Sequence, residues 1–159
     1  MTVSESTSAF QIFYDAPRAE LTMSPSGAIV KLPLPWLAGQ DGEQLGQPNA
    51  RTRWDGDFLL SEDEHFFIGA TLVDARHRLE APVESAYRRL FSITRGWHLY
   101  RIWNYIPGIN LQCEGLERYQ QFNIGRWSAF ESCYGHNLRS YMPAASAVGF
   151  QGDQVDIVF

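Results

Sequence analysis

The segment from Arg101 to Arg126 holds the chain's densest group of side chains that could bind a small molecule. Arg118 and Arg126 lie eight residues apart, so on a helix they project in similar directions about two turns apart. A guanidinium presents a planar fork of donors that suits carboxylates. This spacing therefore predicts a site for a small dianion. The candidate substrate-binding residues are Arg126, Arg118, Tyr119, Asn104, Tyr105 and Asn110.

Two other interpretations of these residues stay open. Arginines on a helix often point into solvent and pair with acidic neighbours, here Glu114, Glu117 or Glu131. Asn104 and Asn110 flank a Pro-Gly turn, where asparagine commonly caps backbone groups. The spacing does not decide between ligand binding and these structural roles.

Other kinds of chemistry have no pattern in this sequence. The four histidines are widely spaced and form no HxH or HExxH motif, so we expect no metal site. There is no glycine-rich phosphate loop, and we expect no cofactor. Neither the serines nor the cysteines occur in a nucleophile motif. The catalytic residues are therefore unknown at this stage.

Composition limits the class of protein. The net charge is -5 and Lys31 is the only lysine, which disfavours nucleic-acid binding. The chain is 45% hydrophobic, yet its apolar runs are too interrupted for a membrane span. The N-terminus has no pattern of a secretory signal, and we expect two free thiols at Cys113 and Cys133. These features predict a cytoplasmic globular protein.

The order of elements predicts one α+β domain over residues 1–159, a sandwich in which two helices pack on one face of a mixed sheet. Residues 1–7 are expected to be disordered. Strands are expected at 10–14, 28–32, within 58–74, and at 97–106, 144–150 and 155–159. A helix should begin near Pro82 and end at Gly96, and a second should run from Glu114 to Tyr134 with Leu116, Tyr119, Phe122, Phe130 and Cys133 on one face. Residues 33–57 are expected to form an irregular loop.

The last residues, VDIVF, form a predicted strand without a polar tail. An unpaired apolar strand tends to pair with another strand. We therefore expect the architecture to continue past Phe159, or the chain to associate with itself or a partner through this last strand.

Three motifs in order, RIWNYIPGIN, ERYQQFNIGR and MPAASAVG, resemble the chorismatase family over about residues 66–159. The resemblance implies a fold similar to the RidA enamine deaminases, doubled in one chain. It also implies that a carboxylic acid protonates the enolpyruvyl ether of chorismate, that water adds, and that pyruvate leaves. In the family this acid is a glutamate of the C-terminal domain, which has no counterpart in this sequence. Arg126, Arg118 and Tyr119 would then hold substrate carboxylates.

Three functional hypotheses follow. The first is a chorismatase N-terminal domain that binds a chorismate-like dianion and packs against a C-terminal RidA-like domain. The second is a stand-alone RidA-like enzyme that acts on imines or enamines as a trimer. The third is a non-catalytic domain, either a ligand sensor or a structural element.

Overall fold

The computed structural model describes residues 10–47 and 49–159. The chain divides into two compact units, with the boundary between Thr71 and Leu72. The prediction of one domain did not separate these units. The prediction for residues 1–7 lies outside the described residues.

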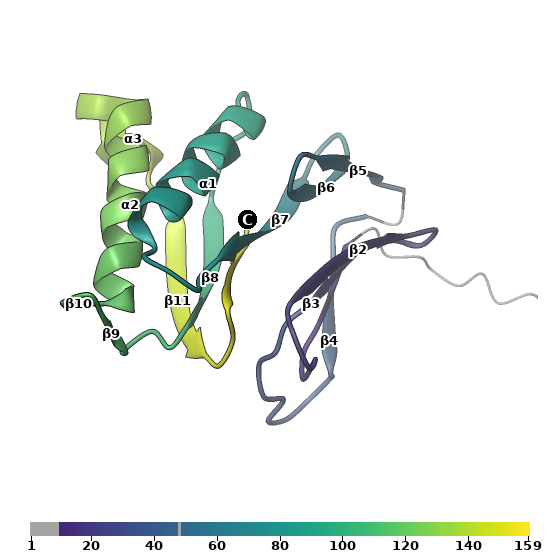
Figure 1. Ribbon diagram of the computed structural model, residues 1–159. Helices are drawn as coiled ribbons and strands as arrows, with labels where there is room; N and C mark the ends of the chain where they lie inside the picture. The colour runs from purple at the N-terminus through teal and green to yellow at the C-terminus, as the bar shows by residue number, and fades with distance from the viewer. Residues whose placement is uncertain (1–9, 48) are drawn as a thin grey trace, which may run out of the picture. The chain divides into compact units, whose positions relative to one another are not determined.

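The first unit contains two strand groups (Figure 1). One is a four-stranded sheet in the order β2-β3-β1-β4, and the other is the antiparallel succession of β5, β6 and the first part of β7. Strand β1 is parallel to β3 and antiparallel to β4. The strands are β1 (Phe10–Phe13), β2 (Glu20–Ser24), β3 (Gly27–Lys31), β4 (Gly42–Leu45), β5 (Arg51–Asp55), β6 (Phe58–Glu62) and β7 (Phe67–Asp74).

The segment 33–57 is not the irregular loop that the sequence predicted, because β4 and β5 lie within it. Both strands, GEQL and RTRWD, lack the apolar pattern of a strand. They form because β4 pairs with β1 and β5 pairs with β6. Strand β2 was also not predicted, whereas the strands at residues 10–14 and 28–32 are confirmed.

The second unit is the predicted combination of a mixed sheet and two helices. Strand β8 pairs in parallel with β11 on one side and antiparallel with β12 on the other. Helices α1 and α2 lie side by side over these strands (Figure 1). The elements are α1 (Glu80–Ile93), β8 (Arg101–Pro107), β9 (Gln112–Cys113), β10 (Leu116–Glu117), α2 (Arg118–Tyr134), the 3-10 helix η1 (Gly135–Asn137), α3 (Leu138–Tyr141), β11 (Ala144–Phe150) and β12 (Gln154–Val158).

Helix α2 begins four residues later than predicted. Glu114 has φ of 50° and lies in the turn between β9 and β10, not in a helix. The helix begins after Glu117 because this residue and Gln120 form a reciprocal capping box. On the predicted apolar face, Phe122 and Phe130 are buried, whereas Tyr119 and Cys133 are exposed. Both cysteines are free, as the sequence predicted.

The last strand is not a free edge. Strand β12 pairs with β8, and on its other side the backbone N–H of Ala75, just after β7, donates to the carbonyl of Asp153 at 2.8 Å. The expected pairing of this strand with a partner assumed an unpaired edge strand. That assumption is wrong, because both sides of β12 are occupied. In the described part of the second unit, the strand at the sheet edge is β11.

A carboxyl group is buried in β12. Asp156 is 1% exposed, and among the described residues neither of its carboxylate oxygens has a hydrogen-bond partner. Burial, and secondarily the charge of Asp153, raises the pKa of Asp156 to about 8. Asp156 is thus mostly protonated at neutral pH.

No helix in the described part of the chain is long and apolar enough to span a membrane.

The raised pKa of Asp156 predicts a pH dependence of stability. The folded state keeps a proton that the unfolded state loses above its ordinary pKa of 3.8. This group should therefore lower the free energy of unfolding by about 1.4 kcal/mol per pH unit between about pH 4 and pH 8. We expect Asp156→Asn to remove this slope and to be more stable than the parent chain at pH 8. Urea unfolding across this pH range measures the difference.

The control for this experiment is Asp57→Asn, which changes an exposed carboxylate. This variant should keep the slope of the parent chain. A parent and an Asp156→Asn protein with the same pH profile would show that Asp156 titrates normally in the folded state.

The two helices approach closely at Gly125. A Cβ atom at this position would clash with the backbone carbonyl of Glu80 at the start of α1. We predict that Gly125→Ala lowers the free energy of unfolding by about 1 to 3 kcal/mol, because backbone must move to admit one methyl group. Glu131→Ala, at an exposed position of the same helix, should change it by less than about 0.5 kcal/mol. Equal urea midpoints for these two variants would contradict the close packing.

Candidate functional site

Arg126 is the predicted site residue with the most unusual surroundings. It lies on the flank of α2, half-buried, with its guanidinium carbon 5.4 Å from the ring centre of Phe130 and 5.9 Å from that of Tyr87. No acidic side chain in the described part of the chain pairs with it, and its buried Nε has no acceptor. Aromatic faces stabilise its charge only in part. A carboxylate would accept hydrogen bonds from this guanidinium and neutralise its charge.

The Tyr87 ring lies beneath Arg126 and is held in place by Asn104. Tyr87 is fully buried and donates its hydroxyl to Asn104 Oδ1 at 2.6 Å. Asn104 Nδ2 in turn donates to the backbone carbonyl of Ser146 at 2.9 Å. Burial raises the pKa of Tyr87 above its usual value, opposed by the nearby charge of Arg126. Tyr87 is therefore a neutral hydrogen-bond donor.

A small cavity opens at the Arg126 side chain. Its volume is about 250 Å³, below the roughly 300 to 1,000 Å³ typical of complete ligand pockets. The walls combine one cation and one amide with two aromatic rings and a thioether, which suits an apolar ring that carries a carboxylate. The lining residues are Asn123, Arg126, Trp127, Phe130 and Met142.

Arg118 and Arg126 do not converge on one point. Arg118 is 9% exposed and donates to two backbone carbonyls, from Nε to Pro107 at 2.9 Å and from a terminal nitrogen to Ala75. Its donors therefore tie the start of α2 to the end of β8 and to the residue after β7. The predicted pairing of these arginines with Glu114, Glu117 or Glu131 is also not seen.

The remaining predicted residues fall in separate places. Tyr119 is 40% exposed at the start of α2, on the same flank as Arg126. Asn110 is exposed in the turn after β8. Tyr105 follows Asn104 in β8, so its side chain points to the opposite face of the sheet. Asn104 has both its polar atoms engaged within the fold.

A second cavity, of about 540 Å³, lies where α1 and α2 end. It includes Arg88, Arg95 and the stacked pair Tyr134 and Tyr141, with ring centres 4.7 Å apart. Arg88 already pairs with Glu84 at 3.3 Å and with Ser132 at 3.0 Å. Helix C-termini also carry partial negative charge, which disfavours anions. This cavity is therefore a weaker candidate for a dianion than the one at Arg126.

Sequence reasoning missed two buried polar groups. Tyr87 is not among the predicted site residues, because the helical period of apolar positions gives no sign of a hydroxyl partner. Asp156 was the one charged residue in an otherwise apolar strand, and that contrast was a usable signal. Among the described residues there is no group of three or more metal-ligating side chains.

The sequence matches the family described as chorismatase FkbO/Hyg5-like, N-terminal, over residues 45–159. The chain is 30% identical over 109 residues to a chorismatase of Streptomyces hygroscopicus, and 32% identical over 103 residues to a 3-hydroxybenzoate synthase of the same organism. These matches cover 66% and 62% of this chain but only 31% and 29% of the relatives.

A solved chorismatase structure has a similar fold, with a TM-score of 0.83 at 22% sequence identity. The similarity covers 98% of this chain and 48% of the solved chain, so this chain spans about half of that protein. The α+β fold is therefore the one seen in a chorismatase. Because the family match covers most of the sequence, this chain belongs to the FkbO/Hyg5-like chorismatases and corresponds to their N-terminal domain.

Proposed function

We propose that this chain serves as the N-terminal domain of a chorismate-hydrolysing enzyme, and that Arg126 binds a carboxylate of the substrate. The observation that carries this proposal is the half-buried guanidinium without an acidic partner at the mouth of a cavity. The names of the relatives, chorismatase and 3-hydroxybenzoate synthase, support the substrate class.

The physical argument rests on the unneutralised charge. A partly buried cation loses hydration, and at Arg126 the rings of Tyr87 and Phe130 replace part of it, without any acidic partner among the described residues. Chorismate carries two carboxylates on and beside a six-membered ring. One carboxylate would accept from the guanidinium, and the ring would lie against Trp127 and Met142. The small volume fits a domain that supplies part of a larger site.

The other predicted residues take different roles in this proposal. Arg118 positions the start of α2 through its bonds to backbone carbonyls. Asn104 acts through Tyr87, which it holds beneath Arg126. Tyr119 is exposed on the same flank and is available for a second polar contact. Tyr105 and Asn110 have no assigned role.

The reaction needs a proton donor as well as carboxylate binding. A proton adds to the terminal methylene carbon of the enolpyruvyl group, water adds to the resulting oxocarbenium carbon, and the hemiketal releases pyruvate and a ring alcohol. A carboxylic acid with a raised pKa suits the first step. Asp156 has such a pKa, but it pairs with Tyr105 across the sheet and so faces away from Arg126. The proposal assigns protonation to the C-terminal domain.

Titration of chorismate into the purified 159-residue chain tests carboxylate binding. Arg126→Gln should weaken the affinity about tenfold to a hundredfold, because a hydrogen bond to a charged group contributes about 1.5 to 3 kcal/mol. Calorimetry gives the dissociation constant, and a lactate dehydrogenase assay of the same samples reports pyruvate. We expect no pyruvate above spontaneous decay.

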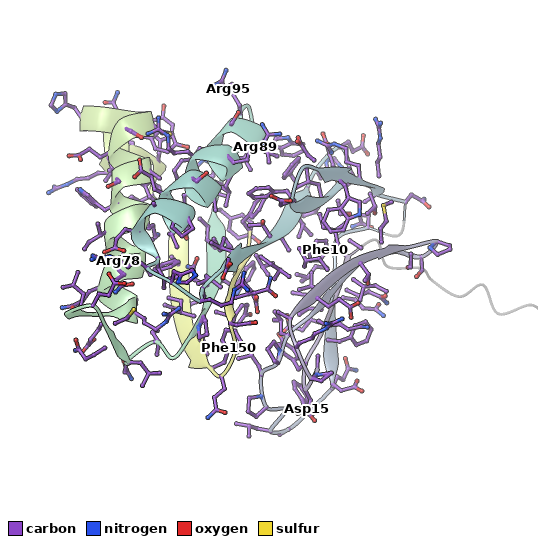
Figure 2. All side chains as sticks on the ribbon, in the orientation of Figure 1. Phe10, Asp15, Arg78, Arg89, Arg95 and Phe150 are labelled. Atoms are coloured by element: carbon purple, nitrogen blue, oxygen red, sulfur yellow. The ribbon has the colours of Figure 1, made fainter. Side chains whose placement is uncertain are left out.

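The matched control is Arg95→Gln, an exposed arginine at the end of α1 (Figure 2). It should bind chorismate like the parent chain. Circular dichroism confirms that each variant is folded. Unchanged affinity in Arg126→Gln would remove the arginine from the proposal, and pyruvate release by the chain alone would show that it contains or assembles the proton donor.

A further inference from the structure

The edge strands of the two larger described sheets differ in one respect. Strands β2, β4 and β5 each carry at least one charged residue, namely Glu20 in β2, Glu43 in β4, and Arg51, Arg53 and Asp55 in β5. Strand β11, with the sequence AASAVGF, carries none. Charges, prolines and bulges on an edge normally prevent pairing with another strand. Strand β11 has none of these protections.

Strand β11 is long and open along this edge. All seven residues pair in parallel with β8, from Ala144 opposite Arg101 to Phe150 opposite Pro107. No strand in the described part of the chain lies on its other side. Ala144, Ala145, Val148 and Gly149 are exposed, and Figure 2 labels Phe150 at the far end of the strand. A regular ladder of backbone groups is thus available.

Exposed apolar side chains lie on β11, just before it, and on the part of α2 that shares a cavity with Met142. Trp127 of α2 is 52% exposed, Met142 before the strand is 44% exposed, and Val148 on the strand is 44% exposed. Large exposed apolar groups that gather around an unprotected edge are typical of an interaction surface. The positions of β11 that share a face with Asn104 are Ala145, Ala147 and Gly149. Ala145 and Ala147 have small side chains, whereas the side chain of Ile109 already fills the space at Gly149.

We propose that β11 pairs with β11 of a second copy of this chain, antiparallel about a two-fold axis at Ala147. In this register Ala147 lies opposite itself, Ser146 opposite Val148 and Ala145 opposite Gly149. No like charges meet, because the strand is uncharged. Such an isologous contact closes at a dimer, in which the same residues act on both sides.

The charge distribution also favours a copy of this unit as the occupant. Residues 72–159 contain nine arginines and eight acidic residues, so two of these units meet with little net repulsion. The negative charge of the chain lies in residues 10–71, which contain nine acidic residues and four basic ones. The surface around β11 includes Trp127 and Met142, which the proposed function places against the substrate ring, so the two proposals share these side chains.

Sedimentation velocity of the 159-residue chain between 1 and 100 µM tests the proposal. We expect a reversible dimer. Val148→Lys should raise its dissociation constant at least tenfold, because it places a charge within the new strand pair. Met23→Lys is the matched control, since Met23 is 52% exposed on the already charged edge strand β2. It should dimerise like the parent chain.

Hydrogen exchange locates the contact. Amides of residues 144–150 should exchange more slowly at 100 µM than at 1 µM in the parent chain, and this difference should vanish in Val148→Lys. A parent chain that stays monomeric overturns the proposal, since its edge would then remain free for a different partner. A trimer, a larger assembly, or a Val148→Lys protein that dimerises normally would overturn it equally.

Discussion

A chain of three polar groups connects α1, β8 and β11 in the second unit. The Tyr87 hydroxyl from α1 bonds to Asn104 in β8, and Asn104 bonds to the backbone of Ser146 in β11. Each buried polar group is costly unless it is paired, by roughly 1 to 3 kcal/mol. The three elements must therefore adopt one relative position to satisfy all of them. Apolar packing alone would tolerate small shifts of α1 along the sheet.

This connection also determines the surroundings of Arg126. Tyr87 is held in one orientation by its hydroxyl, so its ring presents a fixed face toward the guanidinium. Phe130 lies in contact with both, with its ring centre 6.1 Å from that of Tyr87. A cation placed over preoriented rings loses less entropy when a carboxylate binds than one on a free surface. The proposed binding group thus depends on residues that would not touch a ligand.

The periodicity of apolar residues was sufficient to predict most helices and strands of the second unit, but insufficient for much of the first. Helix α1 and strands β11 and β12 have apolar patterns and punctuation by Pro82, Gly96 and Pro143, so their positions were predictable. Strands β4 and β5 are polar and exist only through partners distant in sequence. Side-chain direction was also beyond the sequence. The spacing of Arg118 and Arg126 suits two arginines that bind one ligand. Arg118 instead donates to backbone carbonyls, which no residue pattern reveals.

The two faces of the second sheet accommodate ionisable side chains in different ways. On the helix face, the Arg126 guanidinium has no acidic partner among the described residues. On the other face, Asp156 can take up a proton and does so, as its pKa of about 8 indicates. The sheet between them keeps the carboxyl from neutralising the guanidinium, since Asp156 lies beside Tyr105 and not beside Asn104. One residue further along β12, Ile157 pairs with Asn104 and so lies on the helix face of the sheet. The register of β12 therefore keeps the one acidic side chain of this strand away from Arg126, as the proposed carboxylate site requires.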